Sequence, residues 1–126
     1  MSQPLILCID DDPLSIKVLE SFLSGHFRVS TAPSARGGLA AIEQEVPDLI
    51  ISDVLMPDMN GFEMVSKLRE IPEATNIPLI FISALSQLGN IGKSENSGIT
   101  QFFSKPIDNE QLLDNIHRLL GTQSDS

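Results

Sequence analysis

The sequence predicts an α/β fold: a doubly wound, five-stranded parallel sheet with helices on both faces. Short apolar runs such as residues 5–9 and 49–51 are bounded by turn residues, as expected of strands buried on both faces. Between these runs lie segments whose apolar residues recur at helical spacing. Strands that alternate with helices form a parallel sheet with right-handed crossovers. The strand order we expect is the flavodoxin-like one, 2-1-3-4-5, which is one of the two common orders of such sheets.

The length and composition indicate one globular domain with an acidic surface. The chain has 126 residues, of which 41% are hydrophobic and 20% charged, and its formal net charge is -9. That charge argues against nucleic-acid binding by phosphate neutralisation and against attraction to anionic lipid. It is compatible with binding of cations and of basic partner surfaces.

The cysteine content and the absence of long apolar runs favour a soluble protein of the cytoplasm. The single cysteine, Cys8, lies in an apolar run and is expected to be a buried thiol, because one cysteine cannot form an internal disulfide. No apolar run approaches the length of a membrane span, and the first residues lack a signal-peptide pattern. A reducing, cytoplasmic compartment is the expectation.

The chain opens with a strand at 5–9 that ends in three carboxylates, Asp10, Asp11 and Asp12. Asp12 is placed to cap a helix whose first residue is Pro13. The apolar residues of this helix recur at helical spacing as far as residue 23, and the glycine at position 25 is expected to stop it.

A second strand at 27–32 leads to a second helix, which Ser34 can cap and which runs to about residue 45. Two glycines, Gly37 and Gly38, weaken its first turns. The residues expected on its buried face are Leu39, Ile42 and Val46.

The third strand, 48–53, is followed by a loop and by a helix from about residue 62 that ends at Pro72. A fourth strand covers 78–83. Residues 86–98, where a fourth helix belongs, are rich in Gly and Asn, so we expect them to be the least ordered part of the domain.

A short fifth strand at 101–104 precedes the last helix. Asp108 and Gln111 resemble a capping box at its start, and Gly121 ends it. We expect one domain over residues 1–121, with 122–126 as a flexible tail or the start of a linker.

The carboxyl ends of strands 1, 3, 4 and 5 carry Asp10 and Asp11, Asp53, Ser83 and Lys105, and they meet at one edge of such a sheet. Three neighbouring carboxylates repel each other unless a cation neutralises them or some bind protons. With oxygen ligands only, Mg²⁺ is the cation of choice. A metal-held carboxylate beside a lysine is suited to attack a phosphoryl group, with the serine hydroxyl as a hydrogen-bond donor.

Each of these residues also has a plainer interpretation. Asp53 can simply end its strand and cap a turn, and Asp10 or Asp11 can add negative charge at a helix start. Ser83 can be a satisfied hydroxyl at a strand end, and Lys105 a solvated surface side chain.

Four motifs follow one another at the predicted strand ends: Ile9-Asp10-Asp11, Asp53 with Met56-Pro57 and Gly61, Ser83-Ala84, and Lys105-Pro106. In this order and at these separations they resemble the receiver domain of bacterial two-component response regulators, and the resemblance covers essentially the whole chain. It implies Mg²⁺-dependent phosphorylation of Asp53 by a histidine kinase or phosphotransfer protein.

The resemblance also implies roles for the other site residues. Asp10, Asp11, Asp53 and the backbone carbonyl of Leu55 would hold the metal, with Asp11 favoured over Asp10 as a direct ligand. Ser83 and Lys105 would bind the phosphoryl group, and Phe102 occupies the position of the family's switch aromatic, although a core role suits a phenylalanine better. The bond before Pro106 is expected to be cis, and Leu55 and Leu85 to border the path of the water that hydrolyses the phosphoryl group.

Two features depart from the family pattern. The segment from Gly98 to Gln101 lacks the small residue and the acid usually found before strand 5, and the fourth-helix segment is unusually rich in Gly and Asn. Both lie where the signal would be transmitted, through an effector domain, a partner protein or a homodimer that uses the face of strands 4 and 5. The pattern implies no enzymatic activity beyond self-phosphorylation and self-dephosphorylation.

Three other functions are compatible with this fold. A phosphatase of the haloacid dehalogenase kind uses an aspartyl nucleophile but needs a general acid two residues later, where this chain has Leu55. A flavodoxin-like mononucleotide binder needs a Gly- or Ser/Thr-rich phosphate cradle, which the strand-end loops lack. A receiver-like interaction module that is never phosphorylated would not need the intact set of site residues.

Overall fold

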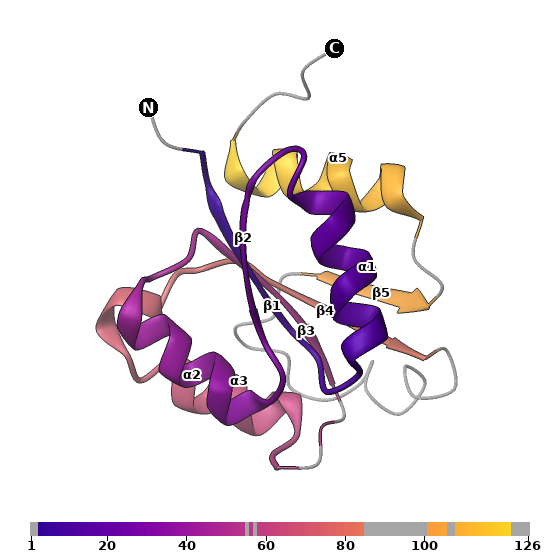
Figure 1. Ribbon diagram of the computed structural model, residues 1–126. Helices are drawn as coiled ribbons and strands as arrows, with labels where there is room; N and C mark the ends of the chain where they lie inside the picture. The colour runs from indigo at the N-terminus through magenta and orange to yellow at the C-terminus, as the bar shows by residue number, and fades with distance from the viewer. Residues whose placement is uncertain (1–2, 55, 57, 85–100, 106–107, 122–126) are drawn as a thin grey trace.

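A computed structural model describes residues 3–54, 56, 58–84, 101–105 and 108–121 of the protein. In the described part of the chain, strands and helices alternate as far as β4 (Figure 1). In chain order they are β1 (Leu5–Ile9), α1 (Pro13–Leu23), β2 (Arg28–Ala32), α2 (Ala35–Gln44), β3 (Leu49–Asp53), α3 (Gly61–Leu68), a 3₁₀ turn (Pro72–Ala74), β4 (Leu79–Ala84), β5 (Gln101–Lys105) and α5 (Asn109–Leu120).

The five strands form one parallel sheet in the order β2-β1-β3-β4-β5, which confirms the predicted fold class and strand order. The central strand β3 pairs with β1 and β4. The flanking pairs β1–β2 and β4–β5 complete the sheet. All five residues of β1 are buried, as are the first four of β3, which is typical of strands covered on both faces.

Helices cover both faces of the sheet, and each face has its own apolar core (Figure 1). The core under α2 and α3 includes Leu7, Ile9 and Ile50, whereas Cys8 and Ile51 pack with residues of α1 and α5 on the other face. Alternate residues of a strand point to opposite faces, so a single apolar run supplies both cores.

The start of α1 agrees with the prediction. Asp12 is the N-cap, its side chain accepts a hydrogen bond from the N–H of Leu14, and Pro13 is the first helical residue. The prediction that Gly25 ends this helix in a left-handed conformation is wrong. The helix ends at the right-handed C-cap Ser24, and among the described residues only Gly121, with φ 72°, has a positive φ. Gly121 therefore supplies the left-handed C-cap of α5, as predicted.

Helix α2 begins at the predicted N-cap Ser34, whose Oγ accepts from the N–H of Gly37 at 3.0 Å. The second glycine of this helix allows close packing, since a Cβ at position 38 would lie 2.4 Å from Cδ1 of Ile9. Ile42 is buried as predicted, but Val46 is 41% exposed and is not on the buried face. The helix ends at Gln44 with Glu45 as an extended C-cap, which turns Val46 away from the core.

The N-terminal caps of α3 and α5 can also be compared with the predictions. Asn60 and Glu63 form a capping box at the start of α3, which begins one residue earlier than predicted. At α5, Asp108 accepts from the N–H groups of Glu110 and Gln111 and is the N-cap, as predicted. The connection after α3 is held by Arg69, whose guanidinium donates to carbonyls of the segment that leads into β4.

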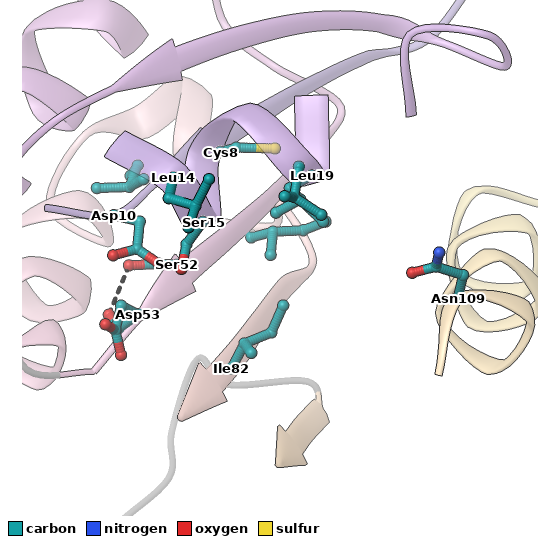
Figure 2. A pocket seen from close by; sticks show the side chains of 12 residues that line it. Cys8, Asp10, Leu14, Ser15, Leu19, Ser52, Asp53, Ile82 and Asn109 are labelled. Atoms are coloured by element: carbon teal, nitrogen blue, oxygen red, sulfur yellow. Dashed lines mark hydrogen bonds between the residues drawn. The ribbon is translucent and has the colours of Figure 1, made fainter. Parts of the chain in front are cut away.

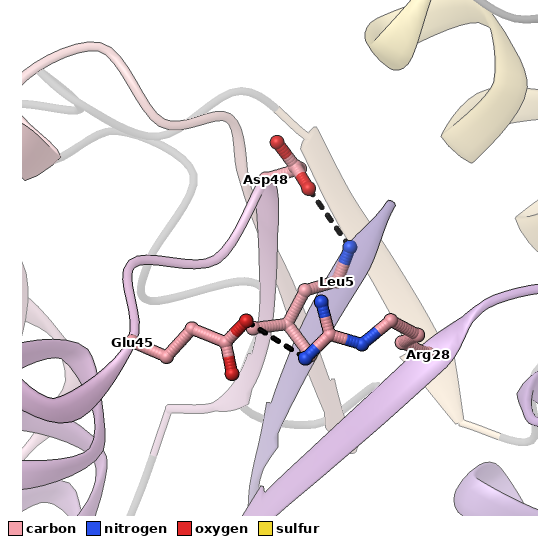
Figure 3. Close-up of polar contacts among 4 residues, drawn as sticks. All are labelled: Leu5, Arg28, Glu45 and Asp48. Carbon is pink, nitrogen blue, oxygen red and sulfur yellow. Dashed lines mark hydrogen bonds and ion pairs between the residues drawn. The ribbon is translucent and has the colours of Figure 1, made fainter. Parts of the chain in front are cut away.

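At the amino-terminal edge of the sheet, polar contacts fix the beginning of β1 and β2 (Figure 3). The carboxylate of Asp48 accepts from the N–H of Leu5 at 2.8 Å, and Arg28 forms an ion pair with Glu45 at 2.7 Å. The ion pair is largely exposed, so its contribution to stability is small.

Several predictions concern residues outside the described ones: Leu55, Leu85, the segment 86–98, the peptide bond before Pro106, and the tail 122–126. In the part of the chain that the structure describes, no helix is both long enough and apolar enough to cross a membrane.

Candidate functional site

Three carboxylates meet at the carboxyl ends of β1 and β3. These strands are neighbours, with Ile9 paired to Ser52, so Asp10 follows β1 beside the place where β3 ends in Asp53. Figure 2 shows the side chains of Asp10 and Asp53 at this edge. Asp10 and Asp53 are half-buried and Asp11 is exposed, which leaves the group open to solvent on one side.

The spacing of these carboxylates suits a small hard cation. Asp10, Asp11 and Asp53 each offer one oxygen, and the three oxygens lie within 4.8 Å of one another. Because Mg–O distances are about 2.1 Å, ligands of an octahedral Mg²⁺ are separated by about 3 Å when adjacent and about 4.2 Å when opposite. The observed limit of 4.8 Å is close to these separations, and a set of carboxylate oxygens is the kind of donor that magnesium prefers, so the residues present fit this ion.

Hydrogen bonds orient the carboxylates. Oδ1 of Asp10 accepts from the N–H of Asp12 at 2.9 Å, and Oδ1 of Asp53 accepts from the N–H of Val54 at 2.7 Å. The hydroxyl of Ser52 donates to the carbonyl of Asp53 at 2.8 Å (Figure 2). Ser52 is the one fully buried polar side chain among the described residues. Ser52 is not among the predicted site residues, although a serine inside an apolar strand next to the acid is the signal that could have identified it.

The other predicted site residues lie on the two following strands. Ser83 is the fifth residue of β4 and Lys105 the last residue of β5, and the register pairs Ala84 with Lys105. Phe102 lies on β5 and pairs with Phe81 of β4. The backbone therefore places Ser83 and Lys105 at the same edge of the sheet as Asp53. The chemical roles of these three side chains stay predictions.

A cavity of about 590 Å³ adjoins the carboxylates. Asp10 and Asp53 line one end of it, α1 contributes Leu14 and Val18, and Asn109 lies across from them on α5 (Figure 2). Leu14 is 70% and Val18 60% exposed. These apolar side chains are four residues apart on one helix and lie beside the acidic group, so an apolar surface borders the carboxylates.

Cys8 lines the same cavity but is not a nucleophile. Its residue is fully buried, and burial raises the pKa of the thiol to about 12, with a further contribution from the negative charge of Glu20. A thiol with this pKa is protonated at neutral pH, whereas nucleophilic attack requires the thiolate. The prediction of a buried core thiol is confirmed.

The fold and the acidic edge define the class of the protein: a parallel α/β domain with a carboxylate site at the carboxyl ends of its strands. Comparison with known proteins then gives the family. The family model of the response regulator receiver domain matches residues 6–117, so the chain belongs to the response regulator receiver family.

Individual relatives agree with this assignment. The chain is 36% identical to the response regulator PleD of Caulobacter vibrioides over 115 residues, which cover 90% of the chain and 25% of PleD. The chain therefore spans about a quarter of that relative.

Solved structures agree as well. The chemotaxis protein CheY4 of Vibrio cholerae superposes with a TM-score of 0.85 at 28% identity, covering 94% of the chain and 99% of CheY4. The receiver domain of the sensor histidine kinase PA1611 from Pseudomonas aeruginosa shares the fold with a TM-score of 0.85 at 22% identity over 97% of the chain and 100% of that domain. The PA1611 structure is described with a magnesium ion coordinated in its active-site cleft.

Proposed function

We propose that this receiver domain is a phosphoacceptor in two-component signalling and that Asp53 takes the phosphoryl group. The observation that carries the proposal is the group formed by Asp10, Asp11 and Asp53, whose oxygens lie within 4.8 Å of one another at the carboxyl edge of the sheet. Capping a helix or ending a strand does not require three carboxylates at this separation, because their mutual repulsion has a cost that only a cation or protons relieve.

Asp10, Asp11, Asp53 and the backbone carbonyl of Leu55 would hold Mg²⁺. When bound, the ion neutralises the carboxylates and accepts oxygens of the phosphoryl group. The related PA1611 receiver domain, with magnesium in its cleft, supports this choice of metal. The exposure of Asp11 leaves one side of the site open to an incoming phosphoryl group.

In the transfer step, a carboxylate oxygen of Asp53 attacks the phosphorus atom of a phosphohistidine in line with the bond that breaks. The phosphorus–nitrogen bond breaks, and its electron pair stays on the imidazole of the donor. The N–H of Val54, which donates to Asp53 Oδ1, restrains the carboxylate before the attack. Lys105 and Ser83 would then bind oxygens of the transferred group, and Phe102 would respond to its presence.

The donor would dock on α1. Leu14 and Val18 form an exposed apolar pair that lines the same cavity as Asp10, and such a pair buries well against a helix of a histidine kinase or phosphotransfer protein. We place the domain in the cytoplasm, a reducing compartment in which a free thiol such as that of Cys8 is usual. Output through an effector domain, a partner protein or a homodimer at β4 and β5 remains a prediction.

The experiment is phosphorylation by acetyl phosphate in the presence and absence of Mg²⁺. The wild type should gain one acid-stable, base-labile phosphoryl group, and chelation of the metal should prevent this. Asp53→Asn should abolish labelling, whereas Asp114→Asn, which removes an exposed carboxylate from α5, should leave it unchanged. Labelling of the wild type without metal, or of Asp53→Asn at the wild-type level, would contradict the proposal.

A further inference from the structure

Asp58 joins two parts of the fold that are distant in the sequence. It lies in the connection from β3 to α3, five residues after Asp53, and its carboxylate accepts two backbone hydrogen bonds from the start of α2. Oδ2 accepts from the N–H of Arg36 at 2.9 Å and Oδ1 from the N–H of Ala35 at 3.3 Å. These bonds hold the connection that follows Asp53 against α2.

The contact supplies what α2 lacks. Ser34, the N-cap of this helix, accepts from the N–H of Gly37, and the first turn of the helix contains no acidic residue. Asp58 accepts from the two N–H groups that precede Gly37 and places a negative charge at the positive end of the helix dipole. The bonds also hold the pKa of Asp58 below its usual range, chiefly through the N–H of Arg36.

The segment between β2 and α2 also contacts the loop after β1, which contains Asp10. The carbonyl of Ala32, at the end of β2, accepts from the N–H of Asp10 at 3.2 Å. The short segment from Ala32 to Arg36 is therefore bonded on one side to the loop of Asp10 and on the other to the connection that contains Asp58. The bonds made by Ala32, Ala35 and Arg36 therefore link the loop of Asp10 to the connection that contains Asp58, and the side chain of Ser34 takes no part in them.

We propose that Asp58 is a positioning residue for the metal site. It anchors the connection after Asp53 to α2 and thereby sets the distance of that connection from Asp10 and Asp11. The inference rests on the proposed function, because it takes the carboxylate group to be a magnesium site. Asp58 itself does not touch the metal. Its effect is on the geometry of the groups that do.

The test compares magnesium binding in Asp58→Ala, Asp58→Asn and the matched control Ser34→Ala. The control removes a different cap of the same helix, the bond from Gly37, without touching the connection after Asp53. The chain contains no Trp and no Tyr, so binding is followed by titration calorimetry and by the amide NMR signals of Asp10 and Asp11.

Asp58→Ala should weaken magnesium binding about tenfold, the lower end of the range for groups that support metal ligands. Asp58→Asn keeps one oxygen acceptor and should fall between the wild type and Asp58→Ala. Ser34→Ala should lower the melting temperature about as much as Asp58→Ala does, but it should leave the magnesium affinity unchanged. In the wild type, magnesium should also shift the amide signals of Ala35 and Arg36, and Asp58→Ala should abolish that response.

Two results would overturn the inference: equal magnesium affinity in the wild type and Asp58→Ala, or equal weakening in Asp58→Ala and Ser34→Ala. The second result would show that α2 affects magnesium binding only through the stability of the helix and not through the contact with Asp58. If magnesium instead moves no signal of Asp10 or Asp11 in the wild type, the proposed metal site itself fails, which is a distinguishable outcome.

Discussion

Gly61 lies directly against the ring of Phe81: a Cβ at position 61 would come within 2.7 Å of Phe81 Cε1. The same Cβ would be 3.2 Å from the carbonyl oxygen of Asp53. The first residue of α3 thus packs on β4 and on the backbone of the proposed phosphoacceptor at once. The N–H of Gly61 donates to the carbonyl of Val54 at 2.6 Å, which closes the loop between them.

Gly61→Ala is therefore expected to destabilise the domain by about 1–3 kcal/mol, the usual cost of overpacking a core. The ring of Phe81 is fully buried and packs edge-on against Phe62, so it has little room to move. The free energy of unfolding is measured by urea denaturation followed by circular dichroism.

Gly25→Ala is the matched control for this variant. A Cβ at position 25 meets no atom within 4 Å, and this glycine does not have a positive φ. The control should be neutral or more stable by up to about 1 kcal/mol, because alanine restricts the unfolded chain. Equal stabilities of Gly61→Ala and the wild type would show that the close approach can relax.

The second prediction concerns the pH dependence that Asp58 confers. Its folded-state pKa lies below the ordinary value of 3.8, so the folded state favours the ionised carboxylate. The stabilisation is fully present above pH 3.8 and is lost as the pH falls through the folded pKa. The stability difference between the wild type and Asp58→Asn should be constant well above pH 3.8 and should shrink on acidification below pH 3.8. A difference that grows on acidification would contradict the assignment.

The third prediction separates donor docking from chemistry. Leu14→Ser combined with Val18→Ser should slow phosphorylation by a histidine kinase about tenfold, since truncation of a hot-spot contact at the centre of an interface costs more than about 1 kcal/mol of binding. Phosphorylation by acetyl phosphate should change little, because the small donor needs no docking surface. Both side chains are exposed, so the domain should remain folded.

Val46→Ser serves as the control for the docking variant, because Val46 is an exposed apolar residue just after α2. It should leave both reactions unchanged. If the α1 double variant reacts with the kinase at the wild-type rate, the donor does not dock on Leu14 and Val18.

The fourth prediction concerns the lifetime of the phosphoryl group. The family resemblance places Leu55 and Leu85 beside the path of the hydrolytic water, and neither side chain can hold that water by a hydrogen bond. Leu55→Asn with Leu85→Glu should therefore accelerate dephosphorylation by roughly tenfold, which corresponds to about 1.4 kcal/mol of activation free energy. The measurement is the decay of the phosphoryl group after the donor is removed. An unchanged or slower decay would mean that these leucines do not control the water.

Much of the fold could be predicted because the decisive signals are local. The apolar run before Asp53 marks β3, Asp12 followed by Pro13 marks the start of α1, and Gly121 marks the end of α5. Val46 was placed wrongly because helical periodicity continues in the sequence beyond the residue at which the helix ends. The end of α1 was misattributed to Gly25 because a right-handed C-cap, here Ser24, leaves no sequence signal.

The candidate site was predictable only in part. The strand order brings Asp10 and Asp53 together, and the sequence pattern predicts that order. The contact of Asp58 with Arg36 spans 22 residues and depends on how two loops approach each other, which periodicity does not encode. The hydrogen bond of the buried Ser52 hydroxyl could not be predicted either, because its acceptor, the carbonyl of Asp53, is brought into place by the backbone at the end of β3.

The central claim, that Asp53 accepts the phosphoryl group, is tested most directly by chemical marking of the phosphorylated residue. The protein is phosphorylated with acetyl phosphate and Mg²⁺ and reduced with borohydride, which converts an aspartyl phosphate into homoserine. Peptide mass spectrometry then locates the homoserine. We expect it at position 53 alone, and in Asp53→Asn nowhere. Homoserine at position 10, 11 or 58 of the wild type, or none at all, would contradict the claim.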